Sequence, residues 1–351
     1  MPIQKVRSRL SLPIFYTCIM LLSGCALLDA ANGASDQNGN ANTPDAQDTP
    51  DAHDGPDGNT EPEILNSAYS LSAGQAHTCA VRKSDSYFEC WGEEGTEKRL
   101  GAPSNAYTSV EAGDWHTCAL SKVGSTVECW GDVEAQPPVP SDAFKSISSG
   151  ASDTCGITAG DGKIKCWGWN PTRGQLLPPD GSNFKAISVG QNHGCAIDAD
   201  DKIQCWGYLH ELVSSKIQTA IDAEAGPNTY RAVSVGANST CAIALETSQV
   251  RCWTSLASPI PNPSPDIEFS AISSYDLRTC GVTNDAAIIC WGATLLNQDP
   301  TEAQPKDDGA FDAIAIGANH TCAVEVTGDA SKVVCWGQPG FEPTWTVPED
   351  L

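Results

Sequence analysis

The chain has 351 residues, enough for one large domain or two smaller ones. Its formal net charge of −24 argues against nucleic-acid partners, whose phosphates need clustered Lys and Arg, and against adsorption on anionic lipid headgroups. Sixteen cysteines without a Cys-x-x-Cys spacing argue against the usual zinc and thioredoxin motifs. An even set of regularly spaced cysteines instead favours disulfides in an exported protein.

The N-terminus predicts export and attachment to lipid. Lys5, Arg7 and Arg9 precede an apolar run over residues 10–22, which is too short to span a bilayer and is typical of a signal peptide. The run ends in Leu22-Ser23-Gly24-Cys25, which resembles the lipobox of bacterial lipoproteins. An ordinary signal peptide with an incidental Cys is the alternative.

The lipobox resemblance implies that residues 1–24 are removed and that Cys25 carries the lipid, palmitate included. Two or three acyl chains anchor a protein stably. Ala26, rather than Asp, follows Cys25, and by the same resemblance this favours the outer membrane of the cell envelope, facing the periplasm or the outside. Residues 29–63 are acidic and nearly free of apolar side chains, so we expect residues 25–63 to form a disordered tether that contacts the membrane only through its lipid.

A module repeats seven times between residue 64 and the C-terminus. Each copy has a leading Cys and a later Cys-Trp pair, and the leading cysteines recur every 37 to 46 residues. This period suits a four-stranded propeller blade. We therefore expect an all-β fold, a seven-bladed β-propeller over residues 64–351.

Two residue patterns around each leading Cys predict how the blades pack. An aliphatic residue stands two positions after it, as Val81 does after Cys79, and lies on the same sheet face. Ala or Gly stands one position after it, as Ala80 does, on the opposite face. We expect the neighbouring blade to approach over this small residue and the Trp to lie across it.

The two cysteines of a copy lie 10 to 13 residues apart, on strands that should form a hairpin. In the third copy a turn at residues 160–161 places Cys155 opposite Cys166, close enough for a bond. We predict one disulfide per blade: Cys79–Cys90, Cys118–Cys129, Cys155–Cys166, Cys195–Cys205, Cys241–Cys252, Cys280–Cys290 and Cys322–Cys335. Free buried thiols are the alternative.

The repeat Gly-x-x-His-Thr-Cys-Ala followed by Val-x-Cys-Trp-Gly resembles that of the regulator-of-chromosome-condensation family, over residues 65–337. The resemblance implies a seven-bladed propeller. Its nucleotide-exchange and chromatin roles need a nuclear address and basic contacts, which this sequence lacks. Ring closure stays open: either the tail around Trp345 or residues 62–68 could supply the last strand of blade seven.

No motif of a hydrolase, phosphate loop or zinc protease occurs, so we predict no catalytic residues, no metal and no cofactor. His77, His116, His193 and His320 share one repeat position; a metal site in the pore is the alternative to hydrogen bonding at a strand start. The insertion over 208–229 suits an outer strand, a rim helix or a partner-binding element.

Residues that depart from the repeat are the candidates for partner binding, because Trp, Tyr and Arg are common interface anchors. They are Trp115, Trp169, Tyr208, His210, Tyr275 and Arg278. We expect a monomeric, non-catalytic module that binds a protein or an envelope polymer. The alternatives are an enzyme inhibitor, like one secreted bacterial branch of this fold, and a polysaccharide hydrolase or lyase.

Overall fold

The computed structural model describes residues 67–92, 105–131, 138–168, 177–207, 213–224, 228–257, 259–292, 309–337, 347–349 and 351. All of them belong to one compact unit, Asn59–Leu351. The expected signal peptide and tether, and with them Cys25, lie outside the described residues, as do Trp169, Tyr208, His210 and Trp345.

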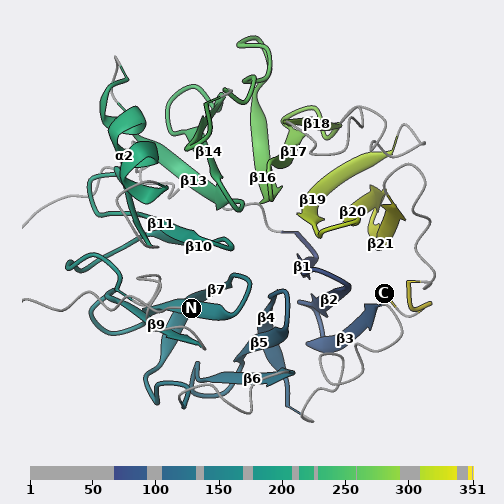
Figure 1. The fold of residues 1–351 in the computed structure, drawn as a ribbon. Coiled ribbons are helices and arrows are strands. Elements are labelled where there is room, and N and C mark those ends of the chain that lie inside the picture. Colours follow the sequence, from purple (N-terminus) through teal and green to yellow (C-terminus); the bar gives the residue numbers. More distant parts are fainter. Residues whose placement is uncertain are drawn as a thin grey trace, which may run out of the picture. The chain divides into compact units, whose positions relative to one another are not determined.

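Seven antiparallel sheets of three strands each stand around a common axis within these residues (Figure 1). Each repeat builds one sheet, and the strands follow chain order from the axis outward. The expected seven-bladed β-propeller is therefore confirmed.

The strands fall into three layers. The inner strands are β1 (Tyr69–Ala73), β4 (Tyr107–Ala112), β7 (Phe144–Ser149), β10 (Ala186–Val189), β13 (Tyr230–Val235), β16 (Phe269–Tyr275) and β19 (Ala310–Ile316). The middle strands are β2 (His77–Arg82), β5 (His116–Ser121), β8 (Asp153–Thr158), β11 (His193–Ile197), β14 (Ser239–Ala244), β17 (Arg278–Thr283) and β20 (His320–Thr327). The outer strands are β3 (Tyr87–Gly92), β6 (Val127–Gly131), β9 (Ile164–Gly168), β12 (Ile203–Gly207), β15 (Val250–Thr254), β18 (Ile288–Gly292) and β21 (Ala330–Gly337).

Each seam between two blades holds one hydrophobic cluster, and its composition follows the expected alternation of faces. In the first seam, Cys79 and Val81 of blade 1 pack against Ala119 and Trp130 of blade 2. The other seams repeat this arrangement. Because each sheet is apolar on both faces, a single blade could not cover itself, and stacking in a ring removes both faces from water.

The ring closes without an exchanged strand among the described residues. Blade 7 packs directly on blade 1, with Val324 against Ala80 and Trp91. The end of the chain joins this seam from outside: Leu351 is buried there, and its carbonyl accepts a bond from the Val333 amide at 3.5 Å. The tail therefore seals the last seam by packing, and residues 67–68 add no strand to it.

One disulfide lies in each blade, as expected from the hairpin register. The bonds join Cys79–Cys90, Cys118–Cys129, Cys155–Cys166, Cys195–Cys205, Cys241–Cys252, Cys280–Cys290 and Cys322–Cys335. In every case the two residues face each other across the middle and outer strands, with Cα atoms 4.0 to 4.1 Å apart. Since each bond closes about a dozen residues, we estimate roughly 2–3 kcal/mol of stabilisation from each.

The repeat length suggested four strands per blade, and the described residues form three. In blades 4 and 5 a side-chain amide occupies the outer edge instead. Gln218 accepts a bond from the Cys205 amide at 2.9 Å and donates one to the Ile203 carbonyl at 3.1 Å. Asn262 accepts a bond from the Cys252 amide at 2.8 Å. These amides satisfy backbone groups that a fourth strand would otherwise pair.

Gln218 belongs to helix α2 (Ser214–Asp222). Of the alternatives for the insertion over 208–229, its described part is therefore the rim helix. The helix lies at the rim of the ring (Figure 1) and buries Ile217 and Ile221 against Tyr230 and Trp253. Its nine residues are far too few to cross a bilayer, and no helix in the described ranges is long and apolar enough to do so.

Candidate functional site: the axial cavity and the turn face

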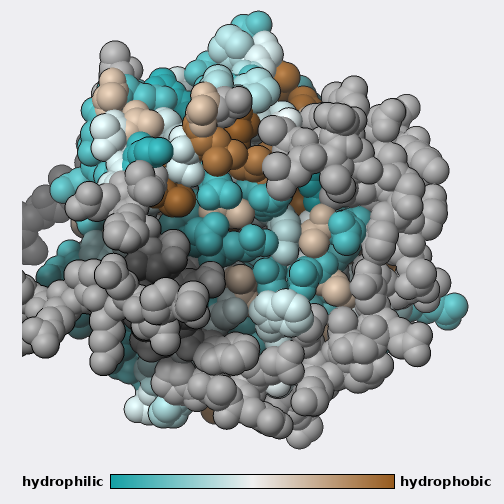
Figure 2. Space-filling model, viewed as in Figure 1, coloured by the Kyte–Doolittle hydropathy of each residue, from teal (hydrophilic) through white to brown (hydrophobic). Residues whose placement is uncertain are grey.

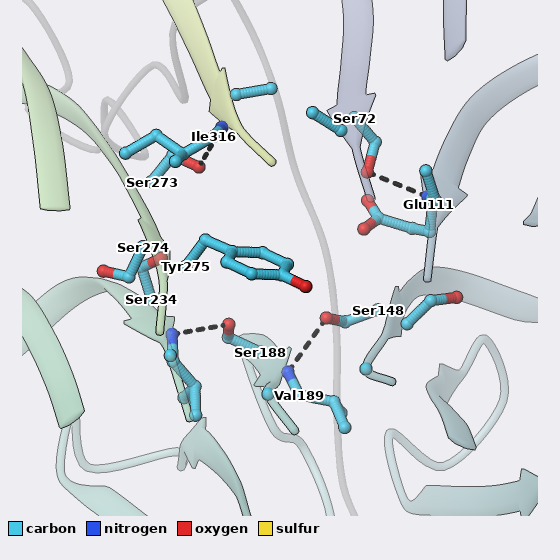
Figure 3. Close-up of a pocket in the computed structure, with 18 of the residues that line it drawn as sticks. Ser72, Glu111, Ser148, Ser188, Val189, Ser234, Ser273, Ser274, Tyr275 and Ile316 are labelled. Atoms are coloured by element: carbon cyan, nitrogen blue, oxygen red, sulfur yellow. Dashed lines mark hydrogen bonds between the residues drawn. The ribbon is translucent and has the colours of Figure 1, made fainter. Parts of the chain in front are cut away.

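A cavity of about 260 Å³ lies on the axis and is lined by all seven inner strands and the turns that follow them. Its wall carries the backbone and the small side chains of these strands, with a hydroxyl or carboxyl from six of the seven blades (Figure 3). Blade 7 has Ala315 at the corresponding position.

Most of these polar groups are serines that hold neighbouring blades together. The Oγ of Ser72 accepts a bond from the Ala112 amide at 2.9 Å, and Ser148 and Ser188 accept bonds from Val189 and Val235 at 3.0 Å each. Ser273 does the same for Ile316 at 3.1 Å. These side chains stand opposite the leading cysteines, so one position of the repeat both lines the cavity and closes the seams.

Glu111 occupies this serine position in blade 2 and places a carboxyl group in the cavity (Figure 3). Its side chain still accepts a bond from the backbone amide of the next blade, at Ser149, and another from the Ser72 hydroxyl. Burial raises the pKa of Glu111 to about 8, although these two bonds oppose the shift. The group is therefore mainly neutral at pH 7.

Tyr275 crosses the cavity at the level where the inner strands end (Figure 3). It stands in blade 6 at the position that is Gly in every other blade. Its hydroxyl donates a bond of 2.8 Å to the carboxylate of Asp114, in the turn after β4 on the far side of the ring. Burial, and after it the charge of Asp114, raises the pKa of Tyr275, so the phenol stays protonated.

The other blades keep Gly at this position because the turns approach closely. A Cβ on Gly190 would lie 2.0 Å from the carbonyl oxygen of Gly236. Such an approach is impossible without moving a backbone, so the turns form a tight collar around the end of the cavity. In blade 6 the carbonyl of Asp276, the residue after Tyr275, faces Gly236.

Arg278 takes the repeat position of histidine in blade 6 and is only 7% exposed. Its guanidinium donates bonds to the carbonyls of Gly317 at 2.8 Å and Ala318 at 3.2 Å in blade 7. Burial lowers the pKa of Arg278 to about 10. Arg278 is thus buried in a seam rather than displayed on a face, where we had expected it to meet a partner.

The four repeat histidines also serve the seams. The Nε2 atoms of His77, His116, His193 and His320 lie 2.7 to 2.8 Å from the Thr hydroxyls of the following blades, Thr117, Thr154, Thr240 and Thr78. Burial lowers the pKa values of His193 and His320 to about 4. Each imidazole is thus held in its own seam instead of converging on a shared ion. Among the described residues, no group of three or more His, Cys, Asp and Glu has the arrangement of a metal site.

The tight turns between inner and middle strands define one surface of the ring, which we call the turn face. It includes Trp115, next to Asp114, with 43% of its surface exposed. Leu256 lies on the same surface, because the neighbouring Ser255 amide donates to the carbonyl of Asn238 in the turn of blade 5. Figure 2 shows hydrophilic side chains in the middle of the ring and a hydrophobic patch beside them.

The structure brings two sequence candidates to this region and separates the third. Trp115 and Tyr275 both belong to turns that border the cavity, whereas Arg278 is buried behind one of them. Sequence reasoning missed Glu111 and Asp114. A signal for Glu111 was available: the residue two positions before the turn Gly is Ser in most copies and Glu in the second.

The fold and this site define a propeller of short disulfide-bonded repeats, and comparisons with known proteins specify the repeat. Residues 184–208 match the regulator of chromosome condensation (RCC1) repeat. The match covers one repeat of the seven, and its leading Cys and later Cys followed by Trp recur in the other six blades.

Solved structures of the same fold come from plants and yeast. The ectodomain of the Arabidopsis thaliana receptor kinase ACR4 is 24% identical, with a TM-score of 0.62 over 77% of this chain and 94% of that one. The ectodomain of the Physcomitrella patens receptor kinase CR4 is 22% identical, with a TM-score of 0.60 over 77% and 73%. Yeast RCC1 (Prp20), bound to Kap60, is 15% identical, with a TM-score of 0.56 over 74% and 81%.

A curated relative in sequence is the serine/threonine-protein kinase-like protein CCR2 of Arabidopsis thaliana. It is 30% identical over 160 residues, which cover 40% of this chain. The chain spans about a fifth of that relative's length (19%). The similarity therefore concerns a part of the relative and not its whole activity.

Proposed function

We propose that this chain is a non-catalytic propeller that binds a protein through its turn face, held at the bacterial outer membrane by lipid on Cys25. The observation that carries the binding role is the exposure of Trp115 beside a polar cavity. An exposed Trp on a rigid turn loses little conformational entropy on binding and buries a large apolar area.

Relatives of the fold support a role in binding. Yeast RCC1 is described in complex with Kap60, and another study of Prp20p describes its binding to Gsp1p and histones. The supporting feature of this chain is its rigidity, since seven disulfides and seven closed seams hold the turns in place. A preorganised surface loses less free energy to ordering when a partner docks.

Site-specific photo-crosslinking tests the binding role. A benzoylphenylalanine at position 115 of the full chain, expressed in its own host, should give a discrete adduct with one protein. Position 123 is the matched control, because Val123 is 80% exposed in the β5–β6 turn at the other end of the same blade. The same adducts at both positions, or none at position 115, would contradict the proposal.

Metabolic labelling with an alkyne-tagged palmitate tests the anchor. The wild-type chain should carry the label and sediment with outer membranes, whereas Cys25→Ser should do neither. A label that persists in the Ser variant would place the lipid elsewhere, and an unlabelled wild type would remove the anchor from the proposal.

A further inference from the structure

We infer that the axial cavity receives the cationic end of one Lys or Arg side chain from the protein that binds the turn face. The inference rests on the proposed function and deepens it by naming the chemistry of the partner. It follows from the size of the cavity, its charge, and two departures from the repeat that meet in it.

The size of the cavity suits a single side chain. Pockets for whole small-molecule ligands usually measure about 300–1,000 Å³, whereas this one holds about 260 Å³. Trp115 directly follows Asp114, which lines the cavity, so a loop that packs on this Trp would stand at the edge of the cavity.

The charge of the cavity is one-sided. The acidic residues Glu111, Asp114 and Asp276 are among its lining residues, and no Lys, Arg or His is. Arg278 lies nearby, and its charge acts on Asp276, while its guanidinium donates bonds to the carbonyls of blade 7. Burial raises the pKa of Asp276, as it does that of Glu111. A cation that entered would therefore meet acceptors whose attraction is weakly screened.

Two departures from the repeat lie here that the packing of blades does not require, although Glu111 also bonds to the Ser149 amide of the next blade. Ser is sufficient to close a seam at the position of Glu111, as blades 1, 3, 4 and 6 show. Gly is sufficient at the position of Tyr275, as the other six turns show. Glu111 even opposes folding above its usual pKa, because burial holds it neutral. Groups that break a local pattern at a cost in stability are expected at functional sites.

Tyr275 gives the cavity an aromatic wall in addition to its acceptors. Its bond to Asp114 fixes one carboxylate across the axis from blade 6. The ring is then available beside the fixed carboxylate, an arrangement that favours a guanidinium or ammonium group.

Binding of a cation should release a proton from the cavity. A positive charge next to Glu111 favours the carboxylate and lowers its pKa. Affinity should therefore rise as pH increases from the lowered pKa of the occupied cavity towards about 8, and it should level off above pH 8, where the empty cavity has already lost this proton. A site that used only Asp114 would show little change over this range.

Calorimetric titration of the full chain with N-acetyl-arginine amide and N-acetyl-lysine amide tests the inference. The neutral isostere N-acetyl-norleucine amide is the ligand control. We expect binding of at least one cationic probe, with an affinity that rises with pH, and at least a tenfold loss in Glu111→Ser. This variant restores the repeat residue, so the seam bond to Ser149 can still form. Glu89→Gln, on the outer strand β3 of blade 1, is the matched control and should bind as the wild type does.

Several results would overturn the inference: norleucine amide binding as well as the cations, no binding by either cation at millimolar concentration, or unchanged affinity in Glu111→Ser. The partner cross-linked at position 115 separates this inference from the proposed function. If Glu111→Ser keeps full affinity for that partner, the inference fails and the proposed function stands. If position 115 yields no adduct while the probes bind, the cavity binds cations, but the claim that the cation comes from a bound protein is wrong. The proposed function is then wrong as well.

Discussion

Each blade of this propeller presents two kinds of surface, one that packs against the next blade and one that faces the axis. The packing surface is nearly identical in all seven seams, with the same cysteine, aliphatic, small and Trp positions. The axial surface differs from blade to blade, with Ser in most, Glu111 in blade 2 and Tyr275 in blade 6. The contrast indicates that the seams were fixed by the needs of the ring, whereas the axis was free to acquire a specific chemistry.

Reduction of the disulfides should have the largest effect on stability, because it acts on the blades whose packing surfaces repeat regularly. Seven bonds worth roughly 2–3 kcal/mol each exceed the usual net stability of a domain. We expect the reduced chain to unfold well below the melting temperature of the oxidised one, measured by circular dichroism with and without a phosphine reductant. Equal melting temperatures would show that seam packing alone holds the ring.

Acid should destabilise the seams by protonating their buried histidines. The folded pKa values of His193 and His320 are about 4, below the value of 6.5 for a free imidazole. Stability from these groups is therefore complete above pH 6.5 and is lost as pH falls towards 4, by up to about 3 kcal/mol for each.

The double variant His193→Asn, His320→Asn should be less stable than the wild type at pH 7, and the difference should shrink towards pH 4. Urea unfolding across this range measures it. A constant difference would mean that these imidazoles keep their ordinary pKa in the folded protein.

Glu111→Ser changes the axial surface, and it should raise the stability of the fold rather than lower it. The folded pKa of about 8 lies above the value of 4.5 for a free carboxyl, so this group lowers stability increasingly as pH rises from 4.5 to 8. We expect the variant to be more stable than the wild type by about 3 kcal/mol at pH 7 and equally stable at pH 4. Chemical denaturation at the two pH values checks this, and lower stability at pH 7 would show that the carboxyl is needed by the fold.

Gly190→Ala tests the collar where the two surfaces meet. The added Cβ would lie 2.0 Å from the Gly236 carbonyl oxygen, so the turns must separate, at a cost of about 1–3 kcal/mol. Gly160→Ala is the control, because no atom lies within 4 Å of the position its Cβ would take. Thermal unfolding of both variants gives the comparison. Equal melting temperatures would show that the collar yields easily.

Much of the blades and their packing surfaces could be predicted from the sequence, because the signals for them are local and repeat seven times. The spacing of cysteines gave the blades, and strand alternation gave the two faces of Val81 and Ala80. The rim helix α2 was one of three alternatives, since the apolar residues of 208–229 fit several elements. Ring closure depended on how Leu351 folds back on the last seam, which no local pattern encodes.

The residues around the axis were harder to predict, because their environment depends on their position in the repeat more than on their residue type. Arg278 has the side chain of an interface anchor, yet it stands where other blades bury His. Tyr275 stands where they require Gly, so it had to enter the space around the axis. Asp114 gains its role only through a partner 161 residues away.

The sulfur chemistry of the blades has a consequence for how the protein matures. No bonded cysteine is more than 13 residues from its mate, so every pair can meet as soon as its own hairpin has formed. Oxidation can then proceed one hairpin at a time from the N-terminal end. Fourteen thiols would not need an isomerase to sort them, and only the last seam would have to wait for the whole chain.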